Sequence, residues 1–187
     1  MNNTSVKSGQ EMEIPELETE RLILREWREE TDFETYAAMM ADADVMRFLL
    51  GEPMSRFEAW RSMAFMVGHW TLRGYGHWAV EERATGRFVG RVGFLNPDGW
   101  PGFEIGWTLA REHWGKGFAT EAARRALTHA FHEMGRDHVI SLIDPDNAPS
   151  IAVATRLGET HESEFDLMGK QVRIYGVSRE RFAEVSG

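Results

Sequence analysis

The sequence contains no cysteine. That absence excludes disulfides, a thiolate nucleophile and zinc sites built on cysteine. Long apolar runs are missing as well, since none approaches the ~18 residues that a membrane-spanning helix requires. The first ten residues are polar and lack the apolar core of a secretory signal. We therefore expect a cytoplasmic protein that does not associate with membranes.

Positive charge is also scarce. Lysine and arginine total 21 against 30 aspartates and glutamates, which gives a formal net charge of −9. Nucleic-acid backbones and anionic membrane surfaces are bound by clustered lysines and arginines. Neither is therefore an expected partner. The sequence leaves the oligomeric state open, a homodimer included.

The residues that are present indicate one compact domain. The chain has 187 residues, of which 42% are hydrophobic and 27% charged, close to globular averages. Residues 1–15 are polar and predict a flexible tail, so that residues 16–187 form a single domain. Strand-like and helix-like patterns mix along the chain, which predicts an α/β (α+β) fold. Strands are expected near 21–25, 76–81, 87–95, 102–109, 139–143, 160–165 and 172–177.

Several local features predict how the helices begin and pack. Thr31 and Ser55 are the expected N-caps of the first two helices. His129 and His132 lie one helical turn apart, but no third ligand is suggested, so a solvated helix face is expected there and no metal. The buried stripe expected on the second helix consists of Phe57, Trp60, Ala64, Val67 and Trp70.

The segment from Gly115 to Gly117 carries the main functional signal. It follows the strand at 102–109 and precedes a long helix, whose free N–H groups and positive dipole end attract phosphate. Glycines let the backbone approach an anion closely. A Walker A loop is excluded because Ala110 and Gly117 stand where it needs Gly and Ser or Thr, and the loop comes too late for a dinucleotide fingerprint. Two glycines can also simply make a tight turn, so the loop alone leaves phosphate binding open.

Further segments share a resemblance with one family. They occur in the order in which that family has them, and together they cover most of residues 17–178. The chain is similar to the GCN5-related N-acetyltransferases (GNAT), and within them to the RimJ/RimL-like group. The segments are Leu17-Glu18-Thr19-Glu20-Arg21-Leu22-Ile23-Leu24-Arg25, Phe103-Glu104-Ile105-Gly106-Trp107, Trp114-Gly115-Lys116-Gly117-Phe118-Ala119-Thr120-Glu121-Ala122, Asn147-Ala148-Pro149-Ser150 and Arg156-Leu157-Gly158.

This resemblance implies a GNAT fold, with a central mixed, mostly antiparallel sheet that splays around a bulge in the strand at 103–109 and is flanked by helices. It implies acetyl-CoA as co-substrate. Backbone amides of the loop would bind the pyrophosphate, the strand end would pair with the pantetheine arm, and Asn147 and Ser150 would contact the cofactor. The loop amides are those of Gly115, Lys116, Gly117, Phe118, Ala119 and Thr120, and the strand residues are Trp107, Thr108 and Leu109.

The resemblance also implies transfer of an acetyl group to a primary amine by direct attack, without a covalent enzyme intermediate. Glu104 is the candidate base, acting through water, and its alternative is a solvent-facing strand residue. Ser150 is the candidate acid for the leaving thiolate, because no tyrosine lies between Tyr75 and Tyr175, and its alternative is an ordinary helix cap.

Two questions stay open at this point. The acceptor is either a small amine or a protein N-terminal α-amine, and the sequence does not choose between them. A non-catalytic acyl-CoA-binding or regulatory module on the same fold is the alternative function, because a fold does not dictate its chemistry.

Overall fold

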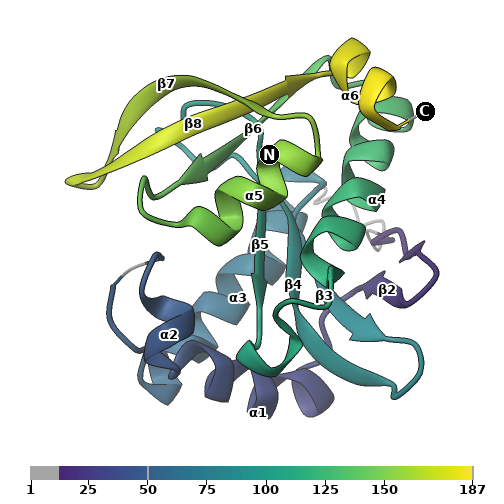
Figure 1. Ribbon diagram of the computed structural model, residues 1–187. Coiled ribbons are helices and arrows are strands. Elements are labelled where there is room, and N and C mark those ends of the chain that lie inside the picture. The colour runs from purple at the N-terminus through teal and green to yellow at the C-terminus, as the bar shows by residue number, and fades with distance from the viewer. Residues whose placement is uncertain (1–12, 50, 187) are drawn as a thin grey trace, which may run out of the picture.

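The computed structural model describes residues 13–49 and 51–186 (Figure 1). Most of the expected tail, 1–15, and residue 187 therefore lie outside the described residues. No helix in the described ranges is long and apolar enough to cross a membrane. The strands are β1 (Leu17–Glu18), β2 (Leu22–Arg25), β3 (His77–Glu82), β4 (Arg87–Leu95), β5 (Glu104–Leu109), β6 (His138–Ile143), β7 (Thr160–Leu167) and β8 (Lys170–Ser178). The helices are α1 (Glu29–Met40), α2 (Ala43–Met46), α3 (Arg56–Arg73), the 3₁₀ turn η1 (Arg111–His113), α4 (Phe118–His132), α5 (Ala148–Arg156) and α6 (Arg179–Ser186).

The strands form one eight-stranded sheet in the order β1-β2-β3-β4-β5-β6-β8-β7. Neighbouring strands are antiparallel except β5 and β6, which are parallel. This confirms the mixed, mostly antiparallel sheet that the sequence resemblance implied.

Helices cover the sheet on both sides, and each side has its own core. Figure 1 shows α4 running along the sheet on one side, while α1, α2 and α3 gather at another. Ala122, Ala126 and Ala130 recur every four residues on α4 and are fully buried against the sheet. On the other side Tyr36 of α1 packs against Phe88 of β4. Helices therefore pack against both faces of the sheet at the central strands β4 and β5.

The sheet opens between β5 and β6, which diverge in Figure 1. These strands pair only at Glu104 and Ile140. One step further along, the Ser141 hydroxyl donates to the Ile105 carbonyl at 3.0 Å in place of a backbone partner. The prediction of a bulge in the strand at 103–109 is wrong, because β4 and β5 pair without a register shift from Glu104 to Leu109. The splay comes from β6 leaving β5.

The two expected N-caps have different outcomes. Ser55 caps α3, and with Glu58 it forms a reciprocal capping box. Thr31 does not cap α1, which begins two residues earlier after Arg28. The carboxylate of Asp32 instead accepts from the Arg28 backbone N–H at 2.9 Å and binds the Arg25 guanidinium through two 2.8 Å contacts. The position at which α1 begins is therefore fixed by Asp32, which is itself held by its ion pair with Arg25.

The buried face of α3 also differs from the expectation. Phe57 is 69% exposed, and Trp60 donates its indole N–H to Glu29 at the surface. Ala64 and Val67 are exposed too, so only Trp70 of the expected stripe is buried. The methionines decide the orientation, because their flexible side chains fill the core beneath the helix. The buried residues of α3 are Ala59, Met63, Met66, His69 and Trp70.

The expected solvated face at His129 and His132 is half right. His132 is exposed, but His129 is only 8% exposed and packs edge-on against Trp78. Among the residues that the structure describes, no group of three or more histidines, aspartates or glutamates could hold a metal ion.

Candidate active site

The loop before α4 has the geometry of an anion-binding helix start. Gly115 and Gly117 adopt left-handed φ angles of 73° and 81°, which other residues rarely adopt. Gly117 is the N-cap and has no side chain to occupy the helix N–H groups. The first intrahelical bond runs from the Glu121 N–H to the Gly117 carbonyl. The N–H groups of residues 118–120 therefore precede the first helical hydrogen bond and are available to a ligand.

Arg21 fixes this loop from the other end of the chain. Its guanidinium donates to the Lys116 carbonyl at 2.9 Å and to the Glu121 carboxylate at 2.6 Å. Burial works to raise the pKa of Glu121, but hydrogen bonds from Thr19 and Arg21 lower it overall. No pattern in the sequence singles out this clamp. The segment Thr19-Glu20-Arg21 was visible in the sequence, but nothing there indicated that it contacts a loop about a hundred residues away.

The end of β5 leads directly into this loop and has one unpaired edge. Trp107, Thr108 and Leu109 pair with β4 on one side. On the other side, within the described ranges, no strand pairs with them, because the β5–β6 ladder stops at Glu104. The Trp114 indole donates to the Leu109 carbonyl at 2.8 Å and ties the loop to the strand end. The opened edge and the helix start are therefore contiguous.

Helix α5 lies on the other side of the opening between β5 and β6. Its N-cap is Asn147, whose side-chain oxygen accepts from the Ser150 backbone N–H at 3.2 Å. The interpretation of Ser150 as the cap is therefore wrong, because it lies in the first helical turn. Its hydroxyl oxygen accepts from the Trp107 indole N–H at 3.3 Å. This contact joins α5 to β5 across the opening and leaves the hydroxyl proton free to donate.

Glu104 lies where the splay begins. It is 9% exposed, so the interpretation as a solvent-facing strand residue is wrong. Burial raises the pKa of Glu104 to about 7, against the opposing effects of a Trp100 hydrogen bond, the Leu142 backbone N–H and the Arg91 charge. The Trp100 indole contact measures 2.6 Å. A carboxyl with this pKa exchanges protons near neutrality.

A second buried carboxyl, Glu159, was not expected from the sequence. It accepts from the Ser141 hydroxyl at 3.2 Å, and that hydroxyl also bonds Ile105. Burial is the main cause that raises the pKa of Glu159 to about 8. No local pattern marks this residue, because its burial arises only when the chain after α5 folds back beside β6.

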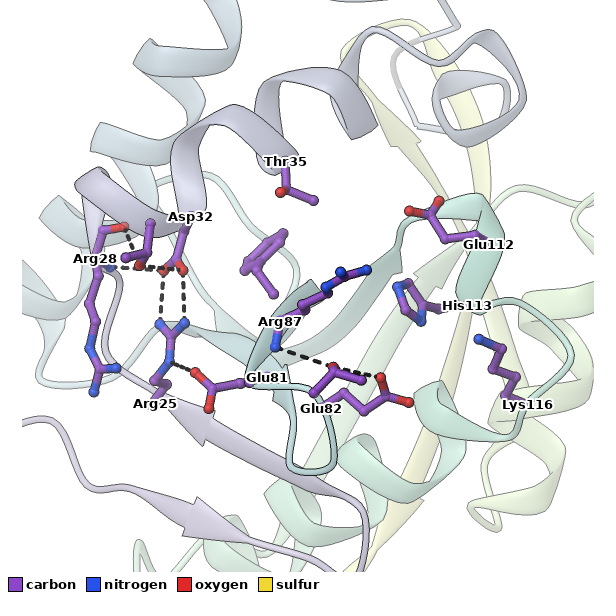
Figure 2. Close-up of a pocket in the computed structure, with 14 residues that line it drawn as sticks. Arg25, Arg28, Asp32, Thr35, Glu81, Glu82, Arg87, Glu112, His113 and Lys116 are labelled. Atoms are coloured by element: carbon purple, nitrogen blue, oxygen red, sulfur yellow. Dashed lines mark hydrogen bonds and ion pairs between the residues drawn. The ribbon is translucent and has the colours of Figure 1, made fainter.

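A polar cavity of about 710 Å³ lies away from the splay (Figure 2). In Figure 2, Arg25, Asp32 and Glu81 form an ion-pair cluster at one end, and His113 and Lys116 stand at the other. Glu104, Trp107 and Ser150 do not line it. The cavity therefore shares Lys116 with the loop but is not where the candidate acid and base meet.

Comparisons with known proteins agree with this geometry. A model of the acetyltransferase (GNAT) domain family matches residues 21–160. The uncharacterized protein YkkB of Bacillus subtilis (strain 168) is 31% identical over 85% of this chain and 93% of its own length.

Solved structures share the fold. The acetyltransferase from Agrobacterium tumefaciens str. C58 has a TM-score of 0.78 and 28% identity, covering 92% of this chain and 99% of its own. The ribosomal L7/L12 alpha-N-protein acetyltransferase RimL, solved with coenzyme A, has a TM-score of 0.72 and 19% identity, covering 88% of this chain and 98% of its own, and shows the likeness of fold alone. With a buried carboxyl at the splay and a glycine loop at a helix start, the chain belongs to the GNAT family of N-acetyltransferases that use acetyl-CoA, in its RimJ/RimL-like group.

Proposed function

We propose that this enzyme transfers the acetyl group of acetyl-CoA to the α-amine of a peptide or protein N-terminus, or to a small amine of similar pKa. The observation that carries the proposal is the buried carboxyl of Glu104 at the opening of β5 and β6, with a pKa of about 7. An α-amine has a pKa of about 7.8 and needs about 0.4 kcal/mol to lose its proton at pH 7.5, whereas a lysine needs about 4 kcal/mol. A base of this strength suits the first class of amine better.

The cofactor is assigned to the glycine loop and the open strand edge. Backbone N–H groups of residues 115–120 would bind the pyrophosphate, and the free edge of residues 107–109 would pair with the pantetheine arm. The left-handed glycines and the uncapped start of α4 support the first contact. The missing β6 partner supports the second. Because the side-chain oxygen of Asn147 caps α5, its NH₂ group is the part that remains to contact the cofactor.

Catalysis is assigned to Glu104 of β5 and Ser150 of α5, which lie on opposite sides of the opening between β5 and β6. Glu104 would accept the amine proton through a water molecule while the amine nitrogen attacks the thioester carbonyl. Ser150 would donate its hydroxyl proton to the leaving thiolate, a role that fits a hydroxyl whose oxygen already accepts from Trp107. A thiol has a pKa of about 8.5, so this acid assists the reaction without being obligatory.

The test is thiol release from acetyl-CoA against a panel of peptides with free N-termini, polyamines and amino acids. Release with a peptide α-amine, and little with N-acetylated peptides that carry lysine, is the expected result. Thermal stabilisation by acetyl-CoA without thiol release from any amine would instead identify a non-catalytic acyl-CoA-binding module.

A further inference from the structure

His77 lies two strands away from Glu104 and reaches the same space. It stands on β3 with only 1% of its surface exposed. The sheet register places it opposite Gly93 of β4, which in turn pairs with Gly106 of β5. A Cβ atom at Gly93 would lie 2.3 Å from the Gly76 carbonyl oxygen, so no side chain fits there. The imidazole can therefore extend across β4 to the face of Gly106.

The tautomer of this imidazole is set by its neighbour. The Arg91 guanidinium lies 3.0 Å from Nδ1. A guanidinium has no acceptor atom, so it donates and Nδ1 must accept. The ring proton consequently sits on Nε2, which together with Cε1 forms the edge of the ring nearest Gly106.

The backbone of His77 is fixed as firmly as its ring. Its carbonyl oxygen accepts from the Trp27 indole at 2.8 Å and from the Trp70 indole at 3.0 Å. These two tryptophans come from the connection between β2 and α1 and from α3. Together with Arg91 of β4, three separate segments therefore hold one histidine in one orientation.

His77 Nε2 and the Glu104 carboxylate converge above Gly106. A Cβ atom built on Gly106 would lie 3.4 Å from His77 Nε2 and 3.9 Å from Glu104 Oε1. Gly106 itself is half-buried and, having no side chain, leaves the space between these two groups unfilled. Within the described residues, the buried Nε2 has no hydrogen-bond partner. A buried donor without a partner is destabilising, and such groups tend to be retained where they have a function.

We propose that His77 is a positioning residue whose Nε2–H donates to the water through which Glu104 receives the amine proton. The inference rests on the proposed role of Glu104. The amine nitrogen bonds to the acetyl carbon as the C–S bond breaks. Its proton passes to the water while the water passes its own proton to Glu104, and His77 keeps its proton throughout. Donation from His77 turns the water so that one hydrogen points at Glu104 and one lone pair points at the amine.

The charges around His77 keep it a neutral donor. Arg91 faces it from β4, Glu104 from β5 and His69 from α3. Burial, and then the Arg91 charge, hold the pKa of His77 well below its usual range. His77 therefore contributes a fixed hydrogen bond to the water and does not transfer its proton.

Two amide variants separate this role from a merely structural one. The side-chain oxygen of His77→Asn can replace Nδ1 as the acceptor for Arg91 but offers no donor at Nε2. The amide of His77→Gln reaches the Nε2 position but leaves Arg91 without its partner. We expect kcat/KM to fall about 10- to 100-fold in His77→Asn and to stay within about fivefold of wild type in His77→Gln. Both should bind acetyl-CoA with unchanged Kd, and melting temperatures confirm that each variant folds.

The kinetic result can overturn the inference in two ways. His77→Asn with wild-type kcat/KM, or His77→Gln more impaired than His77→Asn, would assign the histidine to holding Arg91. If wild-type enzyme releases no thiol with any amine, the proposed function fails instead.

A tautomer measurement tests His77 without any acceptor. In the full-length protein labelled with ¹⁵N-histidine, the signal that disappears in His77→Asn identifies this residue. We expect the Nε2–H form, with a pKa well below the ordinary histidine range. An Nδ1–H tautomer, or titration near the ordinary histidine pKa, would refute the inference.

Discussion

The loop side and the proton-transfer side of the site, which meet at β5, are built in different ways. The loop side takes the end of β5, the glycine loop and the start of α4 from one continuous stretch, residues 107–120. The proposed proton-transfer side combines Trp100 and Glu104, which lie four residues apart at the start of β5, with His77 of β3. A continuous segment can be read as a motif, whereas a set of dispersed residues becomes visible only after folding. Variants on the two sides should therefore fail in different ways, one in cofactor affinity and the other in rate.

The largest effect is expected on the proton-transfer side, from Glu104→Gln. Loss of the base should lower kcat/KM about 100- to 10,000-fold while the Kd for acetyl-CoA stays unchanged. The wild-type rate should rise with pH through about 7 as Glu104 deprotonates, and the variant should lose this limb. A pH–rate profile from pH 6 to 9 checks both. Unchanged kcat/KM across that range would remove Glu104 from the mechanism.

The same variant should be more stable than wild type at high pH. The pKa of Glu104 is raised from 4.5 to about 7 on folding, so the folded state holds the proton more tightly and stability falls as pH rises between these values. The cost is on the order of 3 kcal/mol and is complete above pH 7. Glu104→Gln should therefore melt higher than wild type at pH 8 and match it near pH 4.5. Glu159→Gln is the control for the kinetic effect of Glu104→Gln. It removes a second buried carboxyl, whose pKa is raised mainly by burial and partly by the charge of Glu104, and it should change kcat/KM less than about threefold because Glu159 has no proposed role in proton transfer.

The next largest effect belongs to the loop side, from Gly117→Ala. A left-handed φ of 81° costs an alanine about 1–2 kcal/mol, and the new Cβ would lie 3.4 Å from the Arg21 guanidinium. The strained loop should misdirect the N–H groups of residues 118–120 and weaken acetyl-CoA binding about 10- to 100-fold. Isothermal calorimetry measures this Kd.

Gly74→Ala is the matched control for that variant. Gly74 ends α3 with a φ of 76° and has nothing within 4 Å of a new Cβ. It should cost similar stability and leave the Kd unchanged. Equal losses of affinity in both variants would mean that the effect is general destabilisation and not the loop.

Ser150→Ala should have a moderate effect that depends on pH. Loss of the proposed acid should lower kcat about tenfold at pH 7, because the thiolate then leaves unprotonated. The deficit should shrink towards pH 9, above the thiol pKa of about 8.5. Thr155→Val is the control, since the Thr155 hydroxyl donates to the Ile151 carbonyl on the exposed side of the same helix. A deficit that does not change with pH would assign Ser150 to packing beside Trp107.

The smallest effect is expected from Arg21→Ala, which removes the clamp on the loop. Arg21 is nearly half exposed, so its ion pair with Glu121 contributes little to stability. Its hydrogen bond to the Lys116 carbonyl should nevertheless support the loop, and the Kd for acetyl-CoA should rise about two- to fivefold. Arg83→Ala removes another exposed arginine paired with a glutamate and should leave this Kd unchanged. No difference between the two variants would show that the clamp does not affect binding.

Local chemistry explains where prediction from the sequence worked. The capping box at Ser55 and the glycines at 115 and 117 each depend on a few neighbouring residues, and the structure has them as expected. Thr31 failed as a cap because Asp32, held by Arg25 of β2, accepts from the Arg28 backbone N–H, so that α1 begins after Arg28. The stripe on α3 failed because the apolar residues surround that helix, and only packing selects which of them are buried.

The sequence by itself indicated the family, through the resemblance of short segments, and also the positions of most strands along the chain and the glycine loop, because each depends on short contiguous patterns. Only the tertiary structure decided the environment of the ionisable groups. Glu104 and Glu159 are two glutamates among many in the chain, and the sheet buries both and raises their pKa values. His77 acquires a defined tautomer only because Arg91 folds against it. Burial and hydrogen bonding join residues that lie far apart along the chain, so no local pattern can encode them.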